Sequence, residues 1–209
     1  NVHASHNSRT YKNHGNSRLI SYDAWMEADV CRFVRSWSPR TRGWIVAMTS
    51  HDLVNAWIDA LDYAGRYVFT PVPWVAPGSR VRMCGDGPPC WTVWIVVARP
   101  KTPEMARWGA LPGAYVITAS NHGTFAQNAQ NRHIGGKPLA LMRELVKDYS
   151  RPNDLICDPC AGYGTTLHAA VIEGRHAVGA EINPTTYAHA IGCSTTPCPE
   201  QLNLLEYSQ

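Results

Sequence analysis

The chain has 209 residues, a formal net charge of +3, and 44% hydrophobic and 17% charged residues. An ordinary apolar share with few charges excludes a disordered or low-complexity chain. The longest apolar run, from Trp91 to Ala98, is too short for a membrane-spanning helix, which needs about 20 residues. We therefore expect one folded domain over residues 1–209 that has no membrane partner.

Arginine outnumbers lysine by 15 to 4 in this mildly basic chain. Arginine forms paired hydrogen bonds to phosphates and base edges, so the excess favours an anionic partner, although a codon bias would explain it equally well. The seven cysteines belong to a chain long enough to build its own core, which favours a reduced, cytoplasmic protein. The spacing of Cys157 and Cys160 fits half of a zinc site, but Cys160 lies in a glycine loop with another explanation, so we predict no metal.

After a polar segment at residues 1–22, helical and strand patterns alternate up to residue 98. Asp23 is a candidate N-cap of the first helix, and Gly65 is a candidate end of the second. Residues 71–89 are rich in Gly and Pro and are expected to form a loop. The predicted elements are helices at 24–37 and 50–64 and strands at 44–48, 67–70 and 91–98. The last strand is apolar throughout, which favours a central strand covered on both faces.

Residues 99–136 show little periodicity apart from a short run at 115–118, so we expect a loop-rich insertion there. The pattern becomes regular again from Pro138. It predicts a helix to about Tyr149, a strand at 154–157, a helix at 164–173, a strand at 176–180, and a further helix after Pro184. Strands that alternate with helices predict an α/β fold, with a mostly parallel sheet and helices on both faces.

The strongest signal is the segment in which the strand at 154–157 runs into Asp158 and then a tight Gly162-x-Gly164 turn before a helix. Glycines let a ligand approach the backbone closely, and the helix N-terminus offers unpaired N–H groups. The next strand ends in Glu181, where an acid can hold the two hydroxyls of a ribose. This pattern predicts a site for a nucleotide-type ligand.

The spacing differs from the Gly-x-Gly-x-x-Gly of dinucleotide sites, and Asp158 would repel a pyrophosphate. A ligand without phosphates is therefore favoured, such as S-adenosyl-L-methionine, whose amino-acid end is cationic. A nucleotide-dependent oxidoreductase remains an alternative, and it would bind NAD instead.

Residues 158–166, with the sequence Asp-Pro-Cys-Ala-Gly-Tyr-Gly-Thr-Thr, resemble the D-P-F-x-G-x-G-T motif of amino-group (adenine-N6 or cytosine-N4) DNA methyltransferases. Lys137-Pro138 is similar to that family's Q-K-P helix start, which packs beside the methionine end of the cofactor. Glu181 to Asn183 is similar to its ribose-binding segment. The cofactor-binding residues implied by the resemblance are Lys137, Pro138, Asp158, Pro159, Cys160, Ala161, Gly162, Gly164, Thr165, Thr166, Glu181, Ile182 and Asn183.

These motifs lie near the C-terminal end, which resembles the circularly permuted β group, where the catalytic half precedes the cofactor half. The resemblance implies a Rossmann-like methyltransferase fold. It divides the chain into a catalytic and substrate half at 1–100, a candidate target-recognition insertion at 101–135, and a cofactor-binding half at 136–192. It also leaves a homodimer open.

One departure concerns catalysis. The family's tetrapeptide, Asp/Asn/Ser-Pro-Pro followed by Tyr, Phe or Trp, is not found at a strand end before the first helix. Pro88 and Pro89 precede the wrong strand. We expect the motif to stand just before Asn1, so the catalytic residues are unknown, and the alternative is a catalytically inactive homologue that binds nucleic acid.

The resemblance implies methyl transfer to adenine or cytosine in DNA, with the target base flipped out of the duplex, as in restriction-modification enzymes. A methyltransferase acting on RNA or protein is a further alternative. Basic and polar loops would hold the DNA strand. The candidate DNA-binding residues are His3, His6, Asn7, Arg9, Arg80, Arg82, Arg107 and Arg132, with Asn121 and His122 also in the insertion.

Overall fold

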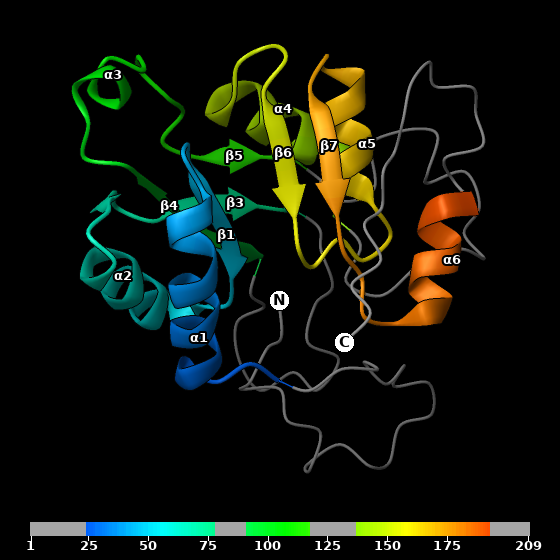
Figure 1. Cartoon of the computed structure of the whole chain (residues 1–209), viewed down its shortest axis with the longest axis horizontal. Coiled ribbons are helices and arrows are strands. Elements are labelled where there is room, and N and C mark those ends of the chain that lie inside the picture. Colours follow the sequence, from blue (N-terminus) through cyan, green and yellow to red (C-terminus); the bar gives the residue numbers. More distant parts are fainter. Residues whose placement is uncertain (1–23, 78–90, 118–136, 193–209) are drawn as a thin grey trace. The chain divides into compact units, whose positions relative to one another are not determined.

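A computed structural model describes residues 24–77, 91–117 and 137–192 (Figure 1). The chain divides into two compact units, residues 1–116 and 117–209. Each unit has its own sheet. No helix among the described residues is both long enough and apolar enough to cross a membrane.

The first unit contains three α-helices and five strands in its described part, with two short 3₁₀ turns. In chain order they are α1 (Glu27–Trp37), η3 (Ser38–Arg40), β1 (Ile45–Thr49), η4 (His51–Leu53), α2 (Val54–Tyr63), β2 (Tyr67–Val68), β3 (Val72–Val75), β4 (Thr92–Arg99), α3 (Pro103–Ala106) and β5 (Tyr115–Val116). The predicted helices and strands up to residue 98 are confirmed within a few residues. The candidate N-cap Asp23 lies outside the described residues; the first turn of α1 is instead closed by the Asp29 carboxylate, which accepts the Met26 N–H at 2.8 Å.

The sheet of this unit has the order β1-β4-β3-β5, and β2 also pairs with β4. The expectation of a mostly parallel sheet is only partly supported. β4 runs antiparallel to β1, β2 and β3, and only β3 and β5 pair in parallel. β3 and β4 follow one another along the chain, and their ladder is extended by the Ala76 N–H, which donates to the Trp91 carbonyl at 2.8 Å.

β4 is the central strand, as its continuous apolar sequence predicts. Residues 95–98 are all buried, and three other strands pair with it. α1 and α2 pack onto the sheet through Val30, Val34 and Leu61, which form one core cluster with Val96 and Ala98. Aromatic rings close the edge of this cluster: Trp25 lies 5.4 Å from Phe33 and 6.1 Å from Trp57 between ring centroids.

β3 falls in the segment predicted to be a loop, so that prediction is wrong for residues 72–75. Pro71 and Pro73 dominate the composition, but Val72 and Trp74 are buried while their neighbours are only partly buried. This alternation of burial is typical of a strand. Two prolines in four residues obscured it, because proline normally marks a turn or an edge strand.

The second unit contains three helices and two strands in its described part: α4 (Leu139–Tyr149), β6 (Leu155–Asp158), α5 (Thr165–Ile172), β7 (His176–Gly179) and α6 (Pro184–Gly192). All five were predicted. β6 and β7 pair in parallel through the crossover helix α5, with Leu155 opposite His176 and Asp158 opposite Gly179. α4 packs against α5 of this βαβ unit, and the buried apolar residues of the two helices include Leu141, Leu145 and Leu167.

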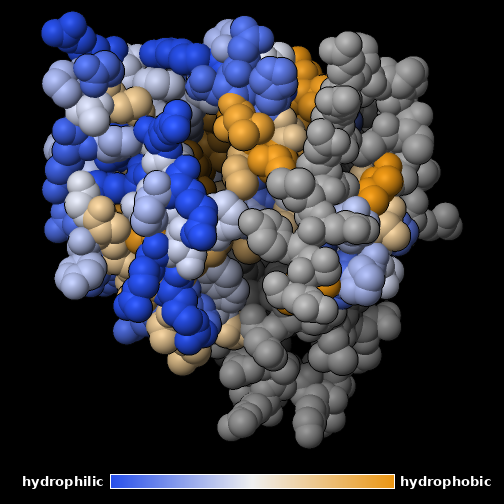
Figure 2. Space-filling model, viewed as in Figure 1, coloured by the Kyte–Doolittle hydropathy of each residue, from blue (hydrophilic) through white to orange (hydrophobic). Residues whose placement is uncertain are grey.

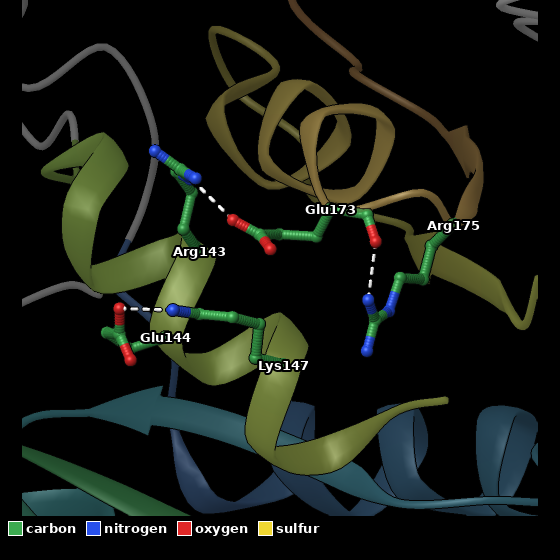
Figure 3. A network of polar contacts seen from close by, with 5 residues as sticks. All are labelled: Arg143, Glu144, Lys147, Glu173 and Arg175. Atoms are coloured by element: carbon green, nitrogen blue, oxygen red, sulfur yellow. Dashed lines mark hydrogen bonds and ion pairs between the residues drawn. The ribbon is translucent and has the colours of Figure 1, made fainter. Parts of the chain in front are cut away.

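Polar contacts fix α4 against the segment between α5 and β7 (Figure 3). The Arg143 Nε donates to the Glu173 carboxylate at 2.5 Å. Arg175 donates from Nε to the Ser150 hydroxyl at 2.9 Å, and also to the carbonyls of Ser150 and Glu173. These bonds join the end of α4 to the turn before β7, so they hold β7 in place beside β6.

Arg66 is a buried cation in the first unit, with 4% of its surface exposed. Its guanidinium donates to the Ser38 hydroxyl at 2.9 Å, to the Gly43 carbonyl at 2.8 Å, and to the carbonyls of Ser38 and Thr41. Burial lowers the pKa of Arg66 from its ordinary value, although a guanidinium keeps its charge in proteins. A single side chain therefore holds the whole loop between α1 and β1.

Replacing Arg66 with Met should lower the free energy of unfolding by about 2–3 kcal/mol, because buried carbonyl oxygens would lose their donors. Urea denaturation measures this change. The control is Arg32→Met, since Arg32 forms only an ion pair with Asp29 and its side chain is 73% exposed; we expect a loss of about 0–1 kcal/mol there. Equal losses in both variants would contradict the assigned role of Arg66.

Candidate functional site

The carboxyl ends of β6 and β7 bring two acidic residues to the same edge. Asp158 is the last residue of β6, and Glu181 follows β7 by two positions. The parallel register places Asp158 opposite Gly179, and the Ala180 N–H donates to the Asp158 carbonyl at 3.0 Å. In parallel α/β sheets, ligands bind at this edge.

The glycine turn between β6 and α5 has the left-handed backbone that its sequence requires. Gly162 and Gly164 have φ values of 54° and 75°, which side chains with a Cβ rarely adopt. Gly164 is the N-cap of α5, and its N–H donates to the Ala161 carbonyl at 2.8 Å. The first turn of α5, with Thr165 and Thr166 partly buried, therefore presents its N-terminus at the same edge.

Glu181 fixes this loop with both of its carboxylate oxygens. Oε2 accepts the Gly162 N–H at 2.9 Å, and Oε1 accepts the Asn183 N–H at 2.8 Å. The Ala161 N–H also donates to the Ala180 carbonyl at 2.9 Å. Each carboxylate oxygen can accept more than one hydrogen bond. The side chain can thus position the loop and still accept hydrogen bonds from a ligand.

Asp158 and Lys137 form the charged part of the site. Asp158 accepts the Cys160 N–H at 3.0 Å, which orients its carboxylate at the strand end. Burial lowers the pKa of Lys137 to about 8, even though the negative charge of Asp158 acts in the opposite direction. Pro138 is the N-cap residue of α4, and its carbonyl accepts the Met142 N–H at 3.1 Å. The start of α4 therefore lies within electrostatic range of Asp158.

Cys160 is exposed, with its thiol next to the two acids. Desolvation by the surrounding loop, together with the negative charges of Asp158 and Glu181, raises the pKa of Cys160 to about 11. The pKa of Cys157 is raised for similar reasons, first by burial and then by Asp158. Thiols with a raised pKa stay protonated at neutral pH, and a protonated thiol is a poor metal ligand and a poor nucleophile. No group of three metal-ligating side chains is found in the part of the chain that the structure describes.

The segment after Glu181 serves two structural purposes. The Asn183 side-chain oxygen accepts the N–H groups of Thr185 and Thr186 at 3.0 and 3.1 Å, so Asn183 caps α6. Ile182 is 96% exposed, an unusual position for a large apolar side chain directly beside a charged site. An exposed apolar residue of this kind can cover one face of a flat ligand ring.

Of the candidate DNA-binding residues, only Arg107 lies within the described residues. It follows α3 in the first unit and is exposed. The candidates outside the described residues are His3, His6, Asn7, Arg9, Arg80, Arg82, Asn121, His122 and Arg132. Arg80 and Arg82 follow the carboxyl end of β3 along the chain, whereas Arg107 precedes β5, which is parallel to β3. The fold therefore places Arg107 at the opposite edge of this sheet from the end of β3.

Sequence reasoning missed two features of the site. Tyr163, between the glycines, lies 6.0 Å from the His189 ring of α6 between ring centroids, so α6 packs beside the loop. The hydrogen bond between Glu181 and the backbone of Gly162 was also not foreseen. No local pattern predicts a contact across 19 residues, although an aromatic residue between two glycines could have suggested a packing role.

The βαβ unit, the glycine turn and the two acids after the strands form a candidate site for a nucleotide-type ligand on a Rossmann-like fold. A family model described as DNA methylase matches residues 18–191. The chain belongs to this family, which comprises the N6-adenine and N4-cytosine DNA methylases.

Curated relatives match a short segment. The type II methyltransferase M.HindIII of Haemophilus influenzae is 41% identical over 59 residues, which cover 28% of this chain and 19% of that protein. The DNA adenine methyltransferase YhdJ of Escherichia coli is 36% identical over 59 residues, which cover 28% of this chain and 20% of that protein. The matched segment thus spans about a fifth of the length of these relatives.

Solved structures confirm the Rossmann-like methyltransferase fold. The complex of M1.HpyAVI with SAM has a TM-score of 0.65 at 21% identity, covering 79% of this chain and 81% of that chain. The cytosine-N4-specific PvuII DNA methyltransferase has a TM-score of 0.62 at 16% identity, covering 90% of this chain and 77% of that chain.

Gly179 should tolerate no side chain. A Cβ there would lie 2.7 Å from the Leu167 Cδ1, 3.0 Å from the Asp158 carbonyl oxygen and 3.1 Å from the Ala161 Cβ. We expect Gly179→Ala to lower the free energy of unfolding by about 1–3 kcal/mol, because overpacking shifts the surrounding backbone. The control is Gly43→Ala, where nothing lies within 4 Å of the added Cβ. Chemical denaturation of both variants tests this, and a Gly179→Ala variant as stable as the control would contradict it.

Proposed function

We propose that this chain binds S-adenosyl-L-methionine and belongs to an enzyme that methylates the exocyclic amino group of adenine or cytosine in DNA. The observation that carries the proposal is the pairing of Asp158 and Glu181 at one sheet edge around a glycine turn. Membership of the DNA methylase family supports it. Relatives described as adenine-specific and as cytosine-N4-specific both occur, so either base is compatible.

The residues present fit each part of this cofactor. Its amino-acid end carries an ammonium and a carboxylate, which Asp158 and Lys137 complement in charge. Its ribose hydroxyls can donate to Glu181, whose oxygens keep acceptor capacity beyond the two backbone bonds. The exposed Ile182 offers an apolar surface for the adenine ring. The cofactor has no phosphate, which agrees with an acid placed directly before the glycine turn.

The remaining cofactor-site candidates support the loop. Pro159, Cys160, Ala161, Gly162 and Gly164 shape its backbone, and Thr165 and Thr166 begin α5. When bound, the cofactor supplies an electrophilic methyl group. The amino nitrogen forms a bond to this carbon as the carbon–sulfur bond breaks, and the nitrogen then loses a proton. The sequence assigns no residue to accept that proton, so the catalytic residues remain those of the expected tetrapeptide.

A DNA substrate of this kind would place the protein in the cytoplasm, in a restriction-modification system or as a solitary methylase. The target base would have to leave the duplex stack before methylation. A homodimer remains open. An inactive homologue that binds nucleic acid, and a methyltransferase for RNA or protein, are the alternatives that the experiments must separate.

Cofactor binding tests the role of Asp158. Asp158→Asn keeps an oxygen to accept the Cys160 N–H but removes the charge that attracts the ammonium. We expect the affinity for S-adenosyl-L-methionine, measured by calorimetry, to fall at least tenfold, or about 1.4 kcal/mol. The matched control is Asp154→Asn, since Asp154 is exposed just before the amino end of β6, away from the site. Unchanged affinity in Asp158→Asn would contradict the proposed site.

Product analysis tests the reaction. The full-length protein is incubated with S-adenosyl-L-methionine and unmethylated DNA, and the digested nucleosides are examined by mass spectrometry. We expect N6-methyladenine or N4-methylcytosine, and Asp158→Asn should abolish the peak. Cofactor binding without any methylated nucleoside would favour the inactive homologue, and methylation of RNA or protein alone would overturn the choice of DNA.

A further inference from the structure

One edge of the first unit gathers basic and aromatic side chains outside the candidate cofactor site. This edge comprises the amino ends of β1 and β2, the carboxyl end of β4, and α3, because β4 runs antiparallel to β1 and β2. We call it the basic-aromatic edge. Its cationic residues are Arg40, Arg42, Arg99, Lys101 and Arg107, above the buried Arg66. The surface of the first unit, on the left of Figure 2, is largely hydrophilic.

The positive charges on this edge exceed the negative ones. Lys101 is paired with Asp62 at 3.6 Å. Within the described ranges, Arg66 is held by carbonyl and hydroxyl oxygens and no carboxylate cancels its charge. Arg42 and Arg107 are exposed, and their guanidinium groups have no partner among the residues that the structure describes. The edge therefore carries a net positive field that attracts anions.

The aromatic rings bring these cations together. Trp44 follows Arg42 by two residues, and its ring lies 5.7 Å from the Trp108 ring, next to Arg107. Trp44 also lies 5.5 Å from Phe69 between ring centroids. Arg99 stacks on Tyr67 and Phe69, 4.7 and 5.6 Å from their centroids. The loop before β1 and the end of α3 are thus neighbours, and the exposed residues Arg42 and Arg107 belong to these adjoining segments.

The dipoles of α1 and α3 do not explain why Arg42 and Arg107 lie on this edge. The Arg40 guanidinium donates to the Ser36 carbonyl in the last turn of α1, where a cation is favoured. Arg42 lies beyond this turn, in the loop that Arg66 holds, and α3 has only four residues, too few for a strong dipole. Two tyrosines also remain open on this edge, with Tyr63 96% and Tyr67 47% exposed. Exposed aromatic rings among unpaired arginines are typical of surfaces that bind nucleic acid.

We propose that the basic-aromatic edge is a second DNA-contacting surface, on which Arg42 and Arg107 bind phosphates of the duplex. The choice of DNA as the partner rests on the proposed function. Ligands of α/β sheets bind at the carboxyl ends of parallel strands. The basic-aromatic edge lies at the amino end of β1, so it is separate from a ligand site of that kind. Its contacts go to the backbone, so they add affinity without sequence preference.

The test measures binding of a mixed-sequence DNA duplex by fluorescence anisotropy at several salt concentrations, using the full chain. Each lost phosphate contact lowers the slope of log K against log salt by about 0.9. Arg42→Gln combined with Arg107→Gln should therefore lower the slope by about 2 and weaken binding about tenfold or more at low salt. The loss should be the same for duplexes of different sequence.

The control variant combines Arg32→Gln and Lys147→Gln, which removes the same charge from exposed residues paired with Asp29 and Glu144. We expect it to keep the slope of the wild type. Equal losses in both double variants, or no loss in Arg42→Gln with Arg107→Gln, would overturn the proposal. Calorimetry with S-adenosyl-L-methionine separates this proposal from the proposed function. Both double variants should bind the cofactor as the wild type does. A wild type that binds the duplex but not the cofactor would overturn the proposed function alone.

Discussion

The parallel pairing of β6 with β7 is the constraint on which the candidate site depends. It requires a residue without a side chain at position 179, because Leu167, Ala161 and the Asp158 backbone occupy the space that a Cβ there would need. With that contact in place, Asp158 and Glu181 reach the same edge and α5 begins between them. The bonds from Arg143 and Arg175 hold α4 and the turn before β7 around this pair. The geometry of the candidate site at this edge is thus a consequence of the close packing behind it.

The helices and strands of the second unit could be predicted almost completely from the sequence, because their signals are local. A strand, an acid, two glycines and a helix follow within a dozen residues, and each residue type has one physical reason to be there. The first unit was less predictable. The direction of β4 depends on which strands it meets, and β3 was hidden by Pro71 and Pro73. The bonds of Arg66 to Ser38 and Gly43 join residues more than 20 positions apart, which no periodicity reveals.

The two units use charge in opposite ways. In the second, Asp158 and Glu181 gather negative charge around a glycine turn, and this also keeps the Cys160 thiol protonated. In the first, exposed arginines lie near the loop between α1 and β1, whose carbonyl groups accept hydrogen bonds from the buried Arg66 guanidinium. One chain therefore carries an acidic site suited to a small cationic cofactor and a basic surface suited to a polyanion. Because binding to DNA releases condensed counterions and binding of a small cofactor does not, salt should weaken DNA binding far more than cofactor binding.

The bond from Glu181 to the Gly162 backbone has a consequence for how a ligand is received. The glycine loop, the most flexible kind of segment in a folded chain, is tied down from the far strand before any ligand arrives. Its conformational entropy is lost during folding and not during binding. A ligand that enters therefore meets a preorganised cradle, and more of its interaction energy with the loop is retained as affinity.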